Sequence, residues 1–166
     1  MISGTGAALP KETDTVVIGA GLYVCGKCLG ICIGMQILSK KGYEHRQTNG
    51  LSFINGEILR LDKIGCKLSI PHIGWNKILR PSYNQGTDWS KTVLKSVDEI
   101  NDVYFIHSFY AAPEDNTITI ATSSYGGFEF CTAVKYNNIT ATQFHPEKSG
   151  ETGLKILEDF CKQLDK

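Results

Sequence analysis

A cysteine flanked by glycines is the first feature of this sequence that could do chemistry. Cys32 stands in the run Gly30-Ile31-Cys32-Ile33-Gly34, after a strand-like apolar stretch and before a helix-like one. A residue at an abrupt strand-to-helix turn adopts a sparsely populated backbone conformation, and flanking glycines remove side chains that would crowd it. A thiol at a helix N-terminus is also favoured as the thiolate. For a cysteine taken alone, burial in a packed strand is the commoner situation.

A second stretch, far along the chain, supplies the partners that a nucleophilic cysteine needs. In His145-Pro146-Glu147, the proline fixes its own φ and disfavours helical backbone at the residue before it, which predicts an extended tripeptide. Alternate residues of an extended chain point to the same side, so the imidazole and the carboxylate can face one pocket. An imidazole that exchanges a proton, oriented by a carboxylate, activates a thiol. Taken alone, this tripeptide would be read as a solvated loop.

Four motifs in a fixed order carry a resemblance to a known family. Gly34-Met35-Gln36 follows the cysteine, and the others are Pro71-His72-Ile73-Gly74-Trp75-Asn76, Phe105-Ile106-His107-Ser108-Phe109-Tyr110 and Gln143-Phe144-His145-Pro146-Glu147-Lys148-Ser149. Together they resemble the class I (triad) glutamine amidotransferases, and within that family the glutaminase subunits of imidazole glycerol phosphate synthase. The resemblance covers roughly residues 28 to 164.

The resemblance implies a fold and a reaction. The fold would be α/β, a flavodoxin-like three-layer sandwich with a mixed, β-rich sheet. The reaction would be hydrolysis of L-glutamine to glutamate and ammonia through a thioester on Cys32, with His145 moving the protons and Glu147 aligning the imidazole. The amide of Ile33 is the expected oxyanion donor. This chemistry requires neither a metal nor an organic cofactor.

The resemblance also implies a set of substrate-binding residues. Gln36 and Glu44 match family positions that contact the substrate amino acid, and the segment His107-Ser108-Phe109 matches one that lines the glutamine pocket largely through backbone groups. From the residues alone, each has a plainer explanation. Gln36 could be an exposed helix residue, Glu44 a surface charge and His107 a core histidine with its hydrogen bonds satisfied.

Ammonia is useful only where another enzyme captures it, so the resemblance implies a partner. That partner would be a (βα)8-barrel cyclase that makes imidazole glycerol phosphate in histidine biosynthesis, bound as a heterodimer. His72 and Trp75 lie in a stretch that is too polar and too broken by glycine for a core, which predicts an exposed structured loop. The resemblance implies that this loop helps to form the docking face, and a packed loop without a partner is the alternative. A paralogous glutaminase that supplies ammonia for amination of a surface-polysaccharide sugar carries the same motifs and stays open as an alternative.

The N-terminal region departs from the family pattern. Family members begin with several βα units and carry a Pro-Gly-Val-Gly loop that contributes to the oxyanion hole, whereas here the cysteine comes at position 32. We therefore expect N-terminal βα units to be missing, residues 1–13 to form a loose leader, and residues 14–166 to form a single, partial domain. Gly19-Ala20-Gly21 would be a remnant or substitute of the loop. A non-catalytic docking module is the corresponding alternative function.

Composition and short motifs argue against other classes of protein. Lysine plus arginine equals aspartate plus glutamate at 17 each, so no net positive field attracts nucleic acid. With neither a membrane-spanning run nor a secretory leader in the sequence, we expect a cytoplasmic protein with reduced thiols. The Cys25-Cys28 pair has no second pair to complete a zinc site. The strand-then-Gly19 pattern fails as a dinucleotide site, because Val24 stands where a third small residue is required.

The remaining pattern is rich in strands. Alternating or apolar runs predict strands at 56–61, 76–80, 103–110, 117–122, 128–134 and 139–144. A helix is predicted from Ile33 to Gly42. The clearest helix is predicted over 149–164, capped by Ser149 and packed through an apolar stripe.

Overall fold

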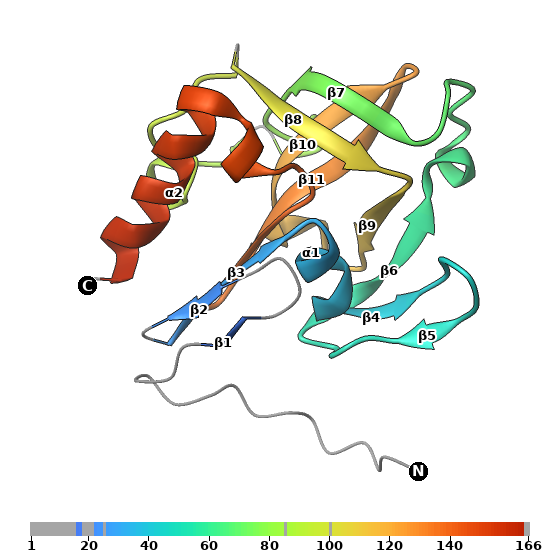
Figure 1. The fold of residues 1–166 in the computed structure, drawn as a ribbon, viewed down its shortest axis with the longest axis horizontal. Coiled ribbons are helices and arrows are strands. Elements are labelled where there is room, and N and C mark those ends of the chain that lie inside the picture. The colour runs from blue at the N-terminus through green and yellow to red at the C-terminus, as the bar shows by residue number, and fades with distance from the viewer. Residues whose placement is uncertain (1–15, 18–21, 25, 85, 100, 165–166) are drawn as a thin grey trace.

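A mixed sheet forms the centre of the molecule in the computed structural model, which describes residues 16–17, 22–24, 26–84, 86–99 and 101–164 (Figure 1). Its strands run in the order β1-β2-β3-β12-β11-β9-β6-β4-β5, with β10 paired to β11. Their bounds are β1 (Val16–Val17), β2 (Leu22–Val24), β3 (Lys27–Ile31), β4 (Ser39–Gly42), β5 (Thr48–Asn49), β6 (Ile54–Arg60), β9 (Phe109–Pro113), β10 (Thr119–Tyr125), β11 (Phe128–Tyr136) and β12 (Ile139–Thr142). The pairs β3–β12 and β4–β6 are parallel, and the other pairs are antiparallel.

A separate two-stranded ribbon and two α-helices complete the described part of the chain. The ribbon pairs β7 (His72–Lys77) with β8 (Asp102–His107) in antiparallel register. The helices are α1 (Ile33–Leu38) and α2 (Gly150–Leu164), and single 3-10 turns occur at Leu61–Ile64, Trp89–Lys91, Asn116–Ile118 and Pro146–Lys148. Within the described residues, no helix has the length and apolar character needed to cross a bilayer.

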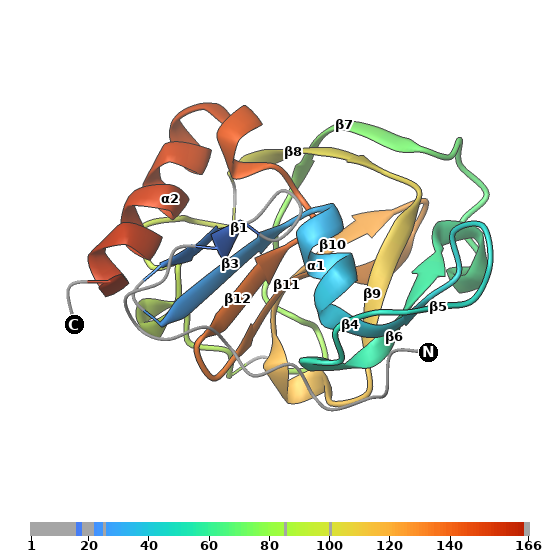
Figure 2. The same ribbon diagram turned by 60° about the horizontal axis from the view of Figure 1, so that its bottom comes forward.

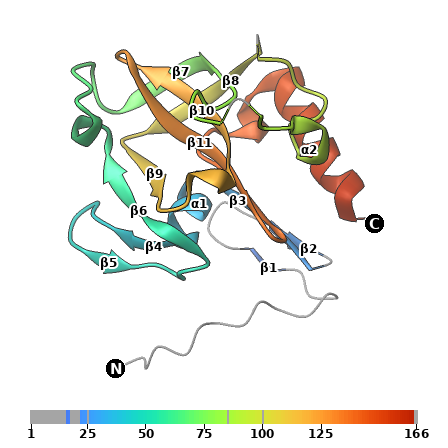
Figure 3. The same cartoon turned by 180° about the vertical axis from the view of Figure 1, so that it is seen from behind.

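Two apolar cores lie on opposite faces of the sheet. Leu29 of β3 belongs to the core that also contains Phe105 of β8 and Ile156 of α2, whereas the preceding residue, Cys28, packs in the core with Met35 of α1. Successive residues of a strand face opposite sides of a sheet, so α1 covers one face while α2 and the ribbon cover the other. Figures 1 and 2 show these three layers, and Figure 3 shows the sheet from behind, with the ribbon above it and α2 at its side. The expected layered α/β arrangement is present.

Several predicted boundaries needed correction. The predicted helix 33–42 ends at Leu38, and Ser39–Gly42 forms β4, because these residues pair with β6 on one side and β5 on the other. The run 103–110 is two strands, β8 and β9, in different sheets. The stretch from His72 to Trp75 is not a loop but part of β7, and the strand predicted at 76–80 extends only to Lys77.

The terminal helix agrees with its prediction. Helix α2 spans Gly150–Leu164 and buries Ile156 and Phe160, whereas Cys161 is exposed. The Ser149 hydroxyl donates to the carbonyl of His145 at 2.6 Å and accepts from the amide of Tyr104 at 2.9 Å. Ser149 therefore ties the ribbon to the turn after β12.

Candidate active site

Cys32 lies at a sharp turn between β3 and α1. Its φ of 50° and ψ of −105° place it outside the regions that residues with a side chain ordinarily occupy. Its amide donates to the carbonyl of Thr142 at 2.7 Å, which ties the turn to the end of β12. A Cβ on Gly30 would lie 2.8 Å from the Leu38 side chain and 3.0 Å from the backbone of Gly34. The predicted strand-to-helix turn is therefore present, and Gly30 permits its close packing.

The sulfur of Cys32 is surrounded by hydrogen-bonding groups. The side-chain Nε2 of Gln143 lies 3.6 Å from Sγ, and the thiol faces the carbonyl of Ile106 at 3.9 Å. Burial raises the pKa of Cys32 above its ordinary value of 9.0, and the Ile33 backbone amide is the largest of the contacts that oppose this rise.

One expectation about the Cys32 thiol, that it would favour the thiolate, was wrong. The negative charge of Glu147 raises the pKa of Cys32 further, the Gln143 amide lowers it, and the more remote charge of Glu44 raises it slightly. Together these effects raise the pKa of Cys32, whereas the helix N-terminus was expected to lower it. Helix α1 has six residues, so its dipole is weak compared with the cost of burying a charge. The resting group is therefore a thiol and not a thiolate.

His145 and Glu147 form a hydrogen-bonded pair at the end of β12. Nδ1 of His145 lies 2.6 Å from Oε1 of Glu147, and the two side chains are 13% and 45% exposed. Nε2 of His145 is buried and has no hydrogen-bond partner within the described residues. Because Nδ1 faces the carboxylate, Nε2 is the nitrogen left for proton exchange.

The backbone around this pair differs from its prediction. His145 is extended, with φ −102° and ψ 97°, but Pro146–Lys148 forms a 3-10 turn with proline at its start. Proline is favoured at the first position of a helical turn, where its missing N–H removes no hydrogen bond. The expected pairing of imidazole and carboxylate is present, but the turn, rather than an extended tripeptide, produces it.

Parallel pairing of β3 with β12 brings these groups to one edge of the sheet. Ile31 is registered opposite Thr142, so Cys32 follows β3 at the same level as the residues that lead to His145. The amide of His145 is fixed by the carbonyl of Tyr104 in β8 at 2.9 Å. The charge of Glu147 acts on the Cys32 thiol. A cysteine and a histidine that are distant in sequence therefore follow two adjacent parallel strands at the same end of the sheet.

A cavity of about 270 Å³ opens beside the sulfur. Of the residues proposed from the sequence, seven line it, namely Cys32, Ile33, Gln36, Glu44, His107, Ser108 and Phe109. Pro71 and Ile106 complete the lining and were not predicted as site residues. His145 and Glu147 are not among the lining residues. The structure thus gathers the predicted substrate-binding residues around one cavity.

A buried pair of histidines supports the wall of this cavity. Nδ1 of His72 lies 3.0 Å from Nε2 of His107, whose Nδ1 lies 2.7 Å from the carbonyl of Phe109. Burial lowers the pKa of each ring to about 4. His107 is therefore a core histidine with its hydrogen bonds satisfied as well as a lining residue. His72, expected on an exposed loop, is buried between Phe105 and Tyr125.

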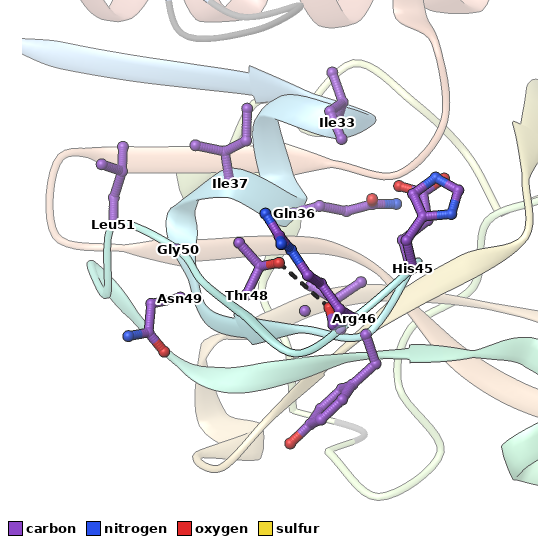
Figure 4. Close-up of a pocket in the computed structure, with 13 residues that line it drawn as sticks. Ile33, Gln36, Ile37, His45, Arg46, Thr48, Asn49, Gly50 and Leu51 are labelled. Atoms are coloured by element: carbon purple, nitrogen blue, oxygen red, sulfur yellow. Dashed lines mark hydrogen bonds between the residues drawn. The ribbon is translucent and has the colours of Figure 1, made fainter.

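A second cavity, of about 390 Å³, adjoins the first (Figure 4). It lies between α1 and the β4–β5 hairpin and shares Ile33, Gln36 and Glu44 with the first cavity. Figure 4 shows Ile33, Gln36 and Ile37 on the helix, facing the hairpin residues that include Arg46 and Thr48. The hairpin was not predicted from the sequence. The proposed leader 1–13, the Gly19-Ala20-Gly21 turn and Cys25 lie outside the described residues.

Comparison with known proteins establishes the class. A family model described as glutamine amidotransferase class-I matches residues 19–164. The chain belongs to this family. A solved structure of a protein from Thermoplasma acidophilum, described as part of a putative GMP synthase, has a TM-score of 0.54 at 17% identity, covering 82% of this chain and 56% of that one. This likeness confirms the expected fold class.

Curated relatives are similar over most of this chain. Imidazole glycerol phosphate synthase subunit HisH of Aquifex aeolicus is 40% identical over 141 residues, covering 83% of this chain and 61% of that protein. HisH 1 of Legionella pneumophila (strain Lens) is 42% identical over 137 residues, covering 81% and 63%. HisH of Geobacter metallireducens is 44% identical over 140 residues, covering 80% and 61%. The chain spans about three-fifths of the length of these relatives.

Proposed function

We propose that this protein hydrolyses L-glutamine and delivers the ammonia to a cyclase that makes imidazole glycerol phosphate in histidine biosynthesis. The observation that carries the proposal is the joint position of Cys32 and the His145–Glu147 pair, which follow two adjacent parallel strands beside a cavity. Membership of the class I amidotransferases and similarity to HisH subunits support the same reaction.

In this proposal, Cys32 is the nucleophile and His145 is the base. The raised pKa of the thiol means that its proton must be removed as sulfur attacks the carboxamide carbon. Nε2 of His145 takes that proton and then gives it to the departing ammonia, leaving a thioester on Cys32. His145 next removes a proton from water, which attacks the thioester. The carbon–sulfur bond then breaks, glutamate is released, and the proton returns from His145 to the sulfur of Cys32. Glu147 holds Nδ1 and stabilises the imidazolium that forms in each half of the reaction.

The cavity offers the groups that glutamine needs. Its volume of about 270 Å³ is below the range of roughly 300 to 1,000 Å³ that holds drug-sized molecules, and it suits a small amino acid. The carboxylate of Glu44 complements an α-ammonium group, and Gln36 supplies amide hydrogen bonds. The His107–Phe109 segment forms the opposite wall. The cavity thus matches an amino acid with a polar side chain.

The amide of Ile33 is the proposed donor to the oxyanion of the tetrahedral intermediate. This amide lies beside the sulfur, where it lowers the pKa of Cys32. A backbone donor at this position follows from the turn itself, because Ile33 is the first residue of α1. Loss of one such donor typically costs about a hundred- to a thousandfold in rate.

The ribbon is the proposed docking face for a (βα)8-barrel cyclase. Ile73 pairs with Ile106 and Trp75 with Tyr104 across β7 and β8, and their apolar side chains lie largely on the exposed face. Trp75 is 57% exposed, and its ring lies 5.9 Å from that of Tyr104. Exposed aromatic side chains beside a reaction centre are typical of protein interfaces. Ammonia released at Cys32 would leave close to this face.

The deciding experiment measures ammonia release from L-glutamine by the whole chain, alone and with the cyclase present, against Cys32→Ala. We expect turnover that depends on Cys32 and increases when the cyclase is added. Equal ammonia release by the two proteins would remove the glutaminase assignment and leave a docking module. Recovery of a sugar-modifying amidotransferase instead of a cyclase in a pull-down would contradict the proposed partner.

A further inference from the structure

Gln143 is a buried polar residue in contact with the reacting sulfur. It follows β12, is fully buried, and donates its backbone amide to the carbonyl of Thr132 at 2.8 Å. Its side-chain Nε2 lies 3.6 Å from Sγ of Cys32. Within hydrogen-bonding distance of sulfur, a carboxamide N–H stabilises a thiolate and has little to offer a thiol.

The surroundings of the sulfur make such a donor necessary. Burial and the charges of Glu147 and Glu44 all disfavour a negative sulfur, and the carbonyl of Ile106 faces the thiol and would repel a thiolate. Two N–H groups oppose these effects, the backbone amide of Ile33 and the side-chain amide of Gln143. In the proposed reaction, the Ile33 amide also serves the oxyanion. Gln143 is then the donor dedicated to sulfur.

The other end of the carboxamide points to the same role. Oε1 of Gln143 is buried and has no hydrogen-bond donor among the described residues. A buried acceptor without a donor is costly, and an apolar side chain would fill the same space without that cost. The contact with Cys32 is therefore the side-chain hydrogen bond that orients this carboxamide in the described part of the chain.

We propose that Gln143 is a catalytic residue whose carboxamide donates a hydrogen bond to the Cys32 thiolate, stabilising it and fixing its position when His145 removes the proton. The role rests on the proposed nucleophilic function of Cys32. This role needs no further reagent. The proton moves from sulfur to Nε2 of His145, and Gln143 stabilises the resulting negative charge without losing a proton.

The test is the pH dependence of Cys32 alkylation by iodoacetamide in the whole chain, followed by peptide mass spectrometry. Gln143→Met removes the donor but keeps the length of the side chain. We expect the midpoint of the rate–pH profile to rise by roughly one pH unit, with about a tenfold lower rate at neutral pH. The titratable groups beside the sulfur, Glu147, Glu44, His145 and His107, are the same in both proteins.

Thr132→Val is the matched control. It removes a buried hydroxyl that has no partner within the described residues, and it retains the carbonyl that accepts from the Gln143 amide. In Thr132→Val, the alkylation rate of Cys32 should depend on pH as it does in the unaltered chain. Alkylation of exposed Cys161 should be the same in all three proteins. Equal Cys32 midpoints in Gln143→Met and the unaltered chain would overturn the proposal.

A second measurement needs no variant in the core. In the unaltered chain, the side-chain amide ¹⁵N signal of Gln143 should shift with the midpoint of Cys32 and stay constant in Cys32→Ala. A signal that is constant through that midpoint would refute the hydrogen bond, even if Gln143→Met fails to fold. Both readouts are independent of glutamine turnover. Absence of ammonia release with these shifts intact would count against the proposed function alone.

Discussion

Nδ1 of His72 lies 3.0 Å from Nε2 of His107, at the position where β7 and β8 pair these two residues. Because Nδ1 of His107 faces the carbonyl of Phe109, that nitrogen carries the proton and Nε2 accepts the hydrogen from His72. One chain of hydrogen bonds thus fixes both tautomers and the start of β9. Protonation of His107 at Nε2 would remove the acceptor and break the hydrogen bond between the rings.

The pair predicts how stability changes with pH. Burial lowers both pKa values from 6.5 to about 4, so the unfolded chain binds protons that the folded chain excludes. The free energy of unfolding is therefore highest above pH 6.5 and decreases as pH falls toward 4, by on the order of 2 kcal/mol for each histidine. Urea unfolding at several pH values measures how the free energy of unfolding changes with pH.

His72→Phe should reduce this pH dependence and leave the part that comes from His107, because the phenyl ring retains the stacking on Phe105 and Tyr125 without a titrating group. His45→Asn, which changes an exposed histidine, should retain the full slope. An unaltered slope in His72→Phe would contradict the assignment of the pH dependence to this pair.

Replacing Cys32 by glycine should stabilise the protein while removing the nucleophile. The φ of 50° at Cys32 costs a residue with a side chain about 1 kcal/mol, and glycine adopts it freely. We expect Cys32→Gly to exceed Cys32→Ala in free energy of unfolding by about 1 kcal/mol. At Ser39, where the backbone is extended, the alanine variant should instead have the higher free energy of unfolding. Greater stability of the alanine variant at both positions would rule out strain at the turn.

Glu147→Gln should affect turnover and thiol acidity in opposite directions. The amide no longer stabilises an imidazolium, so kcat for glutamine should fall by about 10- to 100-fold, a modest loss because water reaches this half-exposed site. Removal of the charge also lowers the pKa of Cys32, which that charge raises, so iodoacetamide should alkylate the sulfur at lower pH.

The control for this variant is Glu151→Gln, which neutralises an exposed carboxylate paired with Lys155 on α2. It should leave both kcat and the alkylation profile unchanged. If Glu147→Gln reduced turnover and alkylation together, the carboxylate would be holding the local fold instead of the imidazole.

Trp75→Ala should weaken binding of the cyclase without unfolding the chain. The side chain is 57% exposed, so its loss should change the free energy of unfolding by less than about 0.5 kcal/mol. Loss of a central aromatic contact typically costs about 2 kcal/mol in binding, or roughly 30-fold in Kd by titration calorimetry. Tyr136→Ala, at the opposite end of β11 from the site, should bind normally. Equal Kd values for the two variants would move the docking face elsewhere.

The sequence predicted the site better than the elements that build it. Cys32, His145 and Glu147 were proposed from short motifs and a family resemblance, and the structure places Cys32 at the expected strand-to-helix turn and pairs His145 with Glu147. The early end of α1 at Leu38 was not foreseen, because Ser39–Gly42 becomes a strand only through pairing with β6, a contact between distant segments. Tertiary pairing of this kind overrides local propensity.

Two polar residues were misjudged or overlooked for the same reason. His72 looked exposed from its polar neighbours, yet pairing opposite His107 places it in the core. Gln143 was noted only as part of a motif, and its contact with the sulfur depends on the register of β3 and β12. A strand register can be seen only in the folded chain, although the alternation of faces along β12 would have placed Gln143 near the cysteine once that register was known.

Because β12 pairs with β3 across more than a hundred intervening residues, the two halves of the candidate site are translated at different times. When the ribosome has added Cys32, it has not yet translated β12, which pairs with β3, or His145, which follows β12. A nascent chain interrupted before β12 therefore carries an inert thiol. The candidate site is complete only after β12 and the turn that carries His145 and Glu147 have been made.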